Sequence, residues 1–66
     1  MKNRIRVARA EVRMTQQQLA EAIGVSRQTI NAIESGKFVP STVLALKMAK
    51  IFKKPVEDIF MLDDED

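Results

Sequence analysis

The apolar positions of this chain recur at helical spacing in several stretches, and short polar or glycine-containing segments separate them. Between residues 16 and 23 the apolar residues fall at i, i+1 and i+4, which places them on one face of a helix. Thr15 precedes this stretch as an N-cap, and Gln18 completes a capping box. Gly24 follows at the position where a left-handed residue ends a helix. The pattern predicts a helix that begins at residue 16 and ends near residue 23.

A second short helix is expected almost immediately afterwards. Ser26 is a second N-cap, and Ile30 and Ile33 form a narrow apolar stripe behind it. Gly36 provides the next stop, so this helix should have roughly nine or ten residues. Because only residues 24–26 join the two helices, their axes must cross steeply. Two short helices joined in this way are typical of the helix-turn-helix unit of DNA-binding proteins.

The outer face and first turn of the second helix carry side chains that suit the reading of base edges. Arginine can pair with guanine, glutamine or asparagine with adenine, and a small apolar side chain with the thymine methyl group. The alternative is that these side chains are simply solvated, as polar residues on an outer helix face usually are. The complete pattern from residue 15 to residue 36 favours DNA binding. The residues concerned are Arg27, Gln28, Thr29, Asn31 and Ala32.

Residues 2–13 are expected to form a helix that packs across this pair, with Asn3 as a candidate N-cap and a face of Ile5, Ala8 and Val12. Arg9 lies on the edge of that face, and Glu34 is the only acidic residue near the end of the second helix of the pair. We predict an ion pair between Arg9 and Glu34. The alternative is two separately solvated charges, and an exposed pair contributes only about 0 to 1 kcal/mol.

The segment after Gly36 should be an extended loop, residues 37–40, because Pro40 disfavours helical geometry at the preceding residue. Phe38 is expected to anchor this loop in the core or at its rim. Ser41 caps a further helix over residues 42–52. Its core positions follow the helical period, and they are Leu44, Ala45, Met48, Ala49 and Phe52. Additional apolar residues widen the face beyond what one core needs and suggest a partner surface: Val43, Leu46 and Ile51.

Pro55 ends this helix and can begin a short fifth one over residues 56–60. Val56, Ile59 and Phe60 should return to the core. Residues 61–62 are either a brief extended edge or a continuation onto a second subunit. Residues 63–66 are expected to be a disordered acidic tail outside a domain of residues 1–62.

The composition of the chain limits the classes of function that are possible. A chain of 66 residues allows one small domain, and a chain without cysteine must be stabilised by helix packing, often with dimerisation. No apolar run approaches the length of a membrane span, so we expect a cytoplasmic protein.

Residues 1–56 carry a net charge of +8 and residues 57–66 carry −6. A basic body suits contact with phosphates. The chain has no histidine or cysteine for catalysis, and we expect no enzyme activity, metal, cofactor or small-molecule ligand.

The segments MTQQQLAEAIGVSRQTINAIESGKFVPS, LALKMAKIF and VEDIF resemble the Cro/C1-type helix-turn-helix family, also called the XRE family, over residues 3–60. The family includes the lambdoid phage repressors. The resemblance implies an all-α fold, a compact five-helix bundle in which helices two and three are the helix-turn-helix. Two residues depart from the family pattern, because relatives often have a large aliphatic residue in place of Ala8 and glycine in place of Arg13. Helix one could therefore sit closer or be rotated, and its end is less defined.

The resemblance also implies roles for individual residues. The family's base-reading positions fall on Arg27, Gln28 and Asn31, with Ala32 at a further groove-facing position. Gln16 matches a residue that bonds a phosphate and supports the first reading residue. Arg9 and Glu34 match a buried or half-buried ion pair. The expected phosphate contacts are Gln16, Gln17, Thr29 and Lys37.

We expect a transcriptional regulator, most simply a repressor, that binds an inverted-repeat operator in double-stranded DNA. It should act as a homodimer through helix four, helix five and the C-terminal segment, with helix three in the major groove. The alternative is an antitoxin-like or adaptor module that uses the same fold to bind a protein. The extra apolar surface motivates that alternative.

Overall fold

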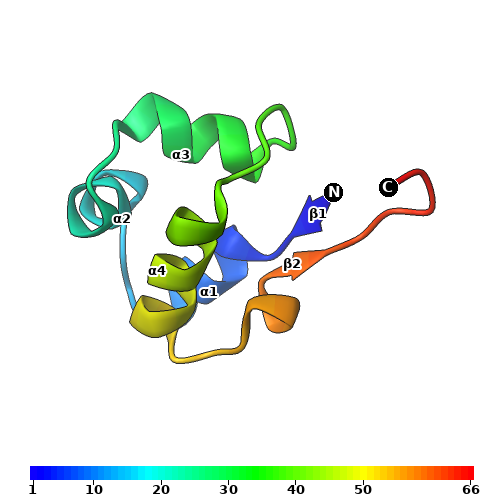
Figure 1. Cartoon of the computed structure of the whole chain (residues 1–66). Coiled ribbons are helices and arrows are strands. Elements are labelled where there is room, and N and C mark those ends of the chain that lie inside the picture. The colour runs from blue at the N-terminus through cyan, green and yellow to red at the C-terminus, as the bar shows by residue number, and fades with distance from the viewer.

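Four α-helices surround one apolar core, and a two-stranded antiparallel ribbon joins the two ends of the chain (Figure 1). A computed structural model describes all 66 residues. None of its helices has the length and apolarity that crossing a membrane requires. The elements are β1 (Lys2–Asn3), α1 (Ile5–Glu11), α2 (Gln16–Ile23), α3 (Arg27–Glu34), α4 (Thr42–Phe52), the 3-10 turn η1 (Val56–Asp58) and β2 (Phe60–Met61).

The first helix of the helix-turn-helix has the bounds that the sequence predicts. The Thr15 hydroxyl accepts a hydrogen bond from the Gln18 backbone N–H at 3.0 Å. The Gln18 side chain accepts one from the Thr15 N–H at 2.9 Å, so both halves of the capping box are present. Gly24 ends α2 with a φ of 80°, a left-handed conformation that glycine adopts without a Cβ clash.

The second helix, α3, has 8 residues, slightly fewer than expected. Ser26 caps it by accepting from the Thr29 N–H at 3.2 Å. It ends before Gly36, whose φ of 81° turns the chain. The N–H groups of Lys37 and Phe38 then both donate to the Ala32 carbonyl, which satisfies the last turn.

The core consists of eleven buried residues, and all of them are apolar. Each helix and the ribbon contribute, so the burial of apolar surface holds the elements together. Lys47 on α4 adds a polar link, because its ammonium donates to the Ile23 carbonyl at the end of α2 over 3.4 Å. The buried residues are Ile5, Ala8, Leu19, Ala20, Ile23, Ile30, Ile33, Met48, Phe52, Ile59 and Phe60.

The first helix is shorter than the sequence predicts. It spans Ile5–Glu11 rather than residues 2–13, because Lys2 and Asn3 pair with β2 in the register Lys2 to Met61 and Asn3 to Phe60. Val12, which was expected on the core face, is 41% exposed because the helix has ended before it. Arg13 follows with a φ of 57°, which explains why glycine suits this position.

The prediction of a fifth α-helix over residues 56–60 is wrong. Val56–Asp58 forms a single 3-10 turn, and Phe60 and Met61 then extend to pair with β1. The backbone groups that a helix would satisfy locally are satisfied here by the N-terminal strand. The burial expectation holds nevertheless, since Ile59 and Phe60 are buried and Val56 packs against the core.

The exposed apolar residues differ in part from expectation. Phe38 is half exposed and does not anchor the loop in the core. Ile51 is half-buried against the core, so it belongs to the domain interior rather than to the surplus surface. Val43 and Leu46 remain exposed on α4.

The acidic tail, which was expected to be disordered, forms a turn against the N-terminus. The Met1 ammonium lies 2.8 Å from Asp63 Oδ2 and 3.2 Å from Asp66 Oδ2. The hydrogen bond to Asp63, followed by that to Asp66, raises the pKa of the ammonium above its ordinary value of 8.0. The pKa of Asp66 is lowered, first by the hydrogen bond from the Asp63 backbone N–H and then by the Met1 ammonium.

Candidate nucleic-acid interface

Helix α3 lies at the edge of the molecule, with one face on the core and the other in solvent (Figure 1). Ile30 and Ile33 are buried, and they fix the rotation of the helix about its axis. Arg27, Gln28 and Asn31 therefore project outward and are exposed. This arrangement is the one that a helix entering the major groove requires.

These side chains share one shallow hollow with the start of α2 and with the loop after α3. Ala32 is its only apolar member, so the hollow offers mainly hydrogen-bonding groups. The hollow brings together most of the residues that the sequence singles out, and it adds one that sequence reasoning missed. The lining residues are Gln16, Arg27, Gln28, Asn31, Ala32, Ser35 and Lys37.

The missed residue is Ser35, which lies seven positions after Gln28 and hence on the same face of the helix. Its hydroxyl donates to the Ala32 carbonyl at 3.1 Å, which leaves its oxygen free to accept. The seven-residue spacing is the signal that could have identified it.

The predicted base-reading side chains differ in whether they already form hydrogen bonds within the chain. Arg27 and Gln28 make no side-chain hydrogen bond or ion pair within the chain. Gln16 Nε2 donates to Asn31 Oδ1 at 3.4 Å, so α2 contacts the third of these side chains. Arg27 and Gln28 thus keep their full hydrogen-bonding capacity for a ligand.

The predicted phosphate contacts do not all meet in this hollow. Gln16 and Lys37 line it, but Gln17 and Thr29 do not. Gln17 Nε2 donates to Glu21 along α2 at 3.3 Å. Thr29 is half-buried, and its hydroxyl lies 3.0 Å from the Ser26 hydroxyl at the helix cap. Neither α2 nor α3 has an acidic residue in its first turn, so no carboxylate neutralises the positive end of either helix.

An ion pair holds the far end of α3 against α1. Arg9 Nε donates to Glu34 Oε2 at 2.8 Å, and Arg9 Nη2 donates to Glu34 Oε1 at 3.2 Å. The ion pair is therefore bidentate. The side chains are 14% and 3% exposed. Asn3 adds a second connection, since its Nδ2 donates to the Ile33 carbonyl at 2.9 Å. Helix α3 is therefore fixed at its core face and at its C-terminal end.

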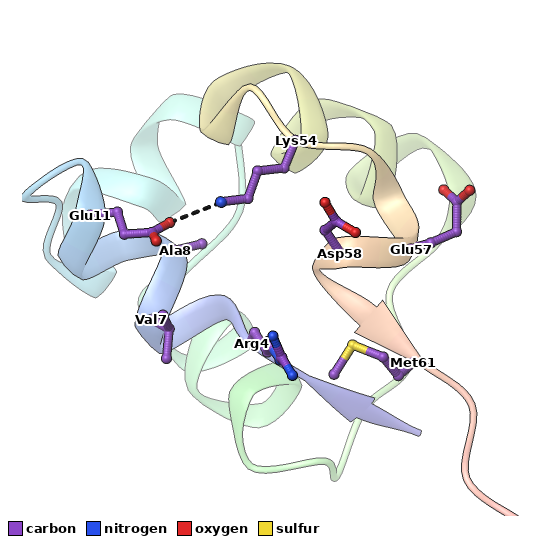
Figure 2. Close-up of a pocket in the computed structure, with 8 residues that line it drawn as sticks. All are labelled: Arg4, Val7, Ala8, Glu11, Lys54, Glu57, Asp58 and Met61. Atoms are coloured by element: carbon purple, nitrogen blue, oxygen red, sulfur yellow. Dashed lines mark ion pairs between the residues drawn. The ribbon is translucent and has the colours of Figure 1, made fainter.

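A second hollow, between α1, η1 and β2, shares no residue with this one (Figure 2). Ala8 lies at its inner side, where a large aliphatic residue would fill part of the space. Lys54 reaches across to Glu11 at 3.2 Å, and Asp58 and Arg4 face the same space. Its rim combines charges of both signs, so it lacks the uniform positive character that a phosphate surface needs.

Comparison with known proteins agrees with this geometry. A family model described as helix-turn-helix matches residues 5–59. An uncharacterised helix-turn-helix transcriptional regulator of Methanocaldococcus jannaschii is 52% identical over 66 residues, which is 100% of both chains. A Bacillus subtilis protein described in the same words is 48% identical over 65 residues, 98% of each chain.

A solved structure supports the same assignment. The clp gene regulator ClgR of Corynebacterium glutamicum superposes with a TM-score of 0.75 at 30% identity, covering 82% of this chain and 57% of that one. The residue pattern, the exposed polar face of α3, the family match and the relatives all agree. The chain belongs to the Cro/C1-type, or XRE, helix-turn-helix family of DNA-binding transcriptional regulators.

Proposed function

We propose that this protein binds double-stranded DNA sequence-specifically, with the N-terminal half of α3 in the major groove. Arg27, Gln28 and Asn31 read base edges there, and Ala32 contacts a thymine methyl group. The observation that carries the proposal is the exposure of Arg27 and Gln28 at the head of α3, without any partner in the chain. Side chains in that state lose few internal contacts when they pair with bases.

Phosphate contacts would position α3 without reading sequence. Lys37 follows α3 and Gln16 begins α2, and both side chains line the hollow that holds the proposed reading residues. The positive ends of α2 and α3 would add attraction for phosphates. Gln17 and Thr29 can join these contacts only by exchanging the internal hydrogen bonds described above. Lys37 and Gln16 are accordingly the stronger candidates.

Two copies would bind an inverted repeat, with the two α3 helices about 34 Å apart in successive major grooves. Such a homodimer would regulate a promoter by occupying it, which makes repression the simplest outcome.

Selection of binding sites from a random duplex pool with the purified protein tests this proposal. An inverted repeat whose half-sites change when Arg27 or Gln28 is replaced is the expected result. A pool that stays random at low salt would refute it.

Single substitutions should separate reading from positioning. Replacing Gln28 with alanine should cost about 1 to 3 kcal/mol at one base position and leave non-specific binding nearly unchanged. Replacing Lys37 with alanine should weaken binding to all sequences and lower the salt slope by about 1. Fluorescence anisotropy over a salt series, with operator and scrambled duplexes, measures both. A uniform loss in the Gln28 variant would contradict its reading role.

A protein-interaction module is a second candidate, because α4 and the C-terminal segment expose Val43, Leu46 and Leu62. A stable complex with a protein partner, together with no salt-dependent DNA binding, would favour that function. The two functions are compatible, since a DNA-binding protein can carry a separate partner surface.

A further inference from the structure

The hollow between α1, η1 and β2 has a volume of about 410 Å³, which lies in the range of small-molecule sites (Figure 2). It shares no residue with the hollow that contains Arg27 and Gln28, so a molecule bound here does not compete with DNA for side chains. Ala8 of α1 is buried at its inner side. A larger aliphatic residue at position 8 would fill part of this space.

Two charged side chains at this hollow have no ionic partner. Arg4 precedes α1 and Asp58 ends η1, and neither belongs to any ion pair of the chain. They face the same space from two sides, and their charged groups lie more than 4.0 Å apart (Figure 2). Lys54, by contrast, is paired with Glu11, and Glu57 points away from Arg4 (Figure 2). The hollow therefore offers one free guanidinium and one free carboxylate that do not neutralise each other.

Apolar side chains lie beside these two charges. Val7 and Met61 flank Arg4, and Val7 is 58% exposed (Figure 2). A guanidinium only donates hydrogen bonds, whereas an ionised aspartate only accepts them. A ligand that satisfies both must carry an anionic acceptor and a cationic donor. The exposed apolar surface between them suits a small apolar group on the same ligand.

We propose that this hollow binds a free α-amino acid with a small or medium-sized apolar side chain. The Arg4 guanidinium pairs with the ligand carboxylate, and Asp58 accepts from the ligand ammonium. The apolar side chain of the ligand lies against Val7, Ala8 and Met61. The two charges of the ligand take the place of the direct ion pair that Arg4 and Asp58 do not form.

The site was not expected from the sequence, because its residues come from both ends of the chain and meet only in the folded protein. Both of its charged groups are open to solvent, so binding must replace their hydration. The dissociation constant should accordingly be roughly 1 mM, as for a small ligand with few contacts.

Titration of the isotope-labelled protein with L-valine, followed by amide proton–nitrogen correlation spectra, tests the site. Isovalerate lacks only the ammonium of L-valine, and isobutylamine lacks only its carboxylate. L-valine should shift the amide signals of α1, η1 and β2 and bind roughly 10-fold more tightly than either probe, because each probe leaves one charge of the protein without a partner. Equal affinity for isovalerate or isobutylamine would overturn the proposal, since the hollow would then attract a single charge only.

Matched substitutions test the two charged contacts. Arg4→Gln should raise the dissociation constant of L-valine roughly 10-fold, whereas Arg6→Gln should leave it unchanged because Arg6 does not line this hollow. Asp58→Asn should have a similar effect, with Glu57→Gln as its control. Equal losses in a variant and its control would show that general charge, rather than this arrangement, attracts the ligand, and would refute the site.

Filling the hollow provides an independent test. Ala8→Leu should abolish the shifts caused by L-valine, and circular dichroism establishes that the variant is folded. The same titration with glycine, L-alanine and L-leucine covers the range of side-chain sizes. No shift with any of these amino acids at about 50 mM would overturn the proposal, since binding at the expected strength would then be nearly saturated. Neither the probes nor the readout involve DNA, so these results are separate from the test of the proposed function.

Discussion

Arg9 and Glu34 are 25 positions apart in the chain, and their side chains form the most enclosed ion pair of the molecule. Arg9 also donates from Nη1 to the Met14 carbonyl at 3.0 Å, immediately before the capping box of α2. One guanidinium therefore connects α1, the start of α2 and the end of α3. Its charge is satisfied by the carboxylate, and removing that partner would leave the charge enclosed without compensation.

Replacing Glu34 with alanine should lower the free energy of unfolding by about 3 kcal/mol, because an enclosed charge loses its partner. Arg6 is the matched control, since its Nε lies 3.7 Å from the same carboxylate but its side chain is 82% exposed. Replacing Arg6 with alanine should change the stability by less than about 0.5 kcal/mol. Urea unfolding followed by far-ultraviolet circular dichroism measures both, as the chain has no tryptophan or tyrosine. Similar small losses in both variants would contradict the structural role of the pair.

The candidate reading residues could be identified from local sequence because the apolar stripe of α3 fixes which positions remain outside. Ile30 and Ile33 face the core, so Arg27, Gln28 and Asn31 must face away. Hydrogen bonds between side chains of different helices could not be predicted in this way. The contact between Gln16 and Asn31 depends on the crossing of α2 and α3, which periodicity alone does not give.

At the scale of elements, two helices end at residues that are not glycine but adopt a left-handed conformation. Arg13 follows α1 with a φ of 57°, and Lys53 ends α4 with a φ of 55°. A side chain with a Cβ is disfavoured there by about 1 to 2 kcal/mol relative to the right-handed region. The ends persist because the chain must turn toward α2 and toward η1.

Replacing Lys53 with glycine should therefore raise the free energy of unfolding by about 0.5 to 1 kcal/mol, since the left-handed strain disappears. Lys50, one turn earlier and exposed, is the control because it carries the same charge inside the helix. Replacing Lys50 with glycine should lower the stability by about 1 kcal/mol. Thermal unfolding of the two variants should shift in opposite directions. A shift in the same direction would exclude backbone strain as the cause.

At the scale of the whole molecule, the N-terminal segment closes the fold. The ribbon pairs residues from the two ends of the chain, and the Arg4 N–H donates to the Ile59 carbonyl at 2.8 Å. Asn3 completes the closure, because its Oδ1 accepts from the Ile5 N–H while its Nδ2 donates to carbonyls at the end of α3. The Asn3 amide is thus hydrogen-bonded both to the start of α1 and to the end of α3.

Replacing Asn3 with alanine should lower the free energy of unfolding by about 2 kcal/mol, because partly buried backbone groups lose their partner. Asn31 is the control, since it is exposed on α3. Replacing Asn31 with alanine should change stability by less than about 0.5 kcal/mol and weaken operator binding instead. Urea unfolding and DNA titration of both variants distinguish the two roles. A loss of stability in the Asn31 variant equal to that of Asn3 would contradict this division.

The sequence by itself determined the three helices α2, α3 and α4, including their caps, because capping and helical periodicity act within a few residues. It also identified an outward polar face on α3. Only the tertiary structure decided that residues 56–61 form a turn and a strand, since their pairing partner lies at the other end of the chain. The same holds for Val12, which is exposed because α1 ends before it, and for Phe38, which is half exposed in the loop after α3. Interactions between distant segments outweigh local preference wherever that preference is weak.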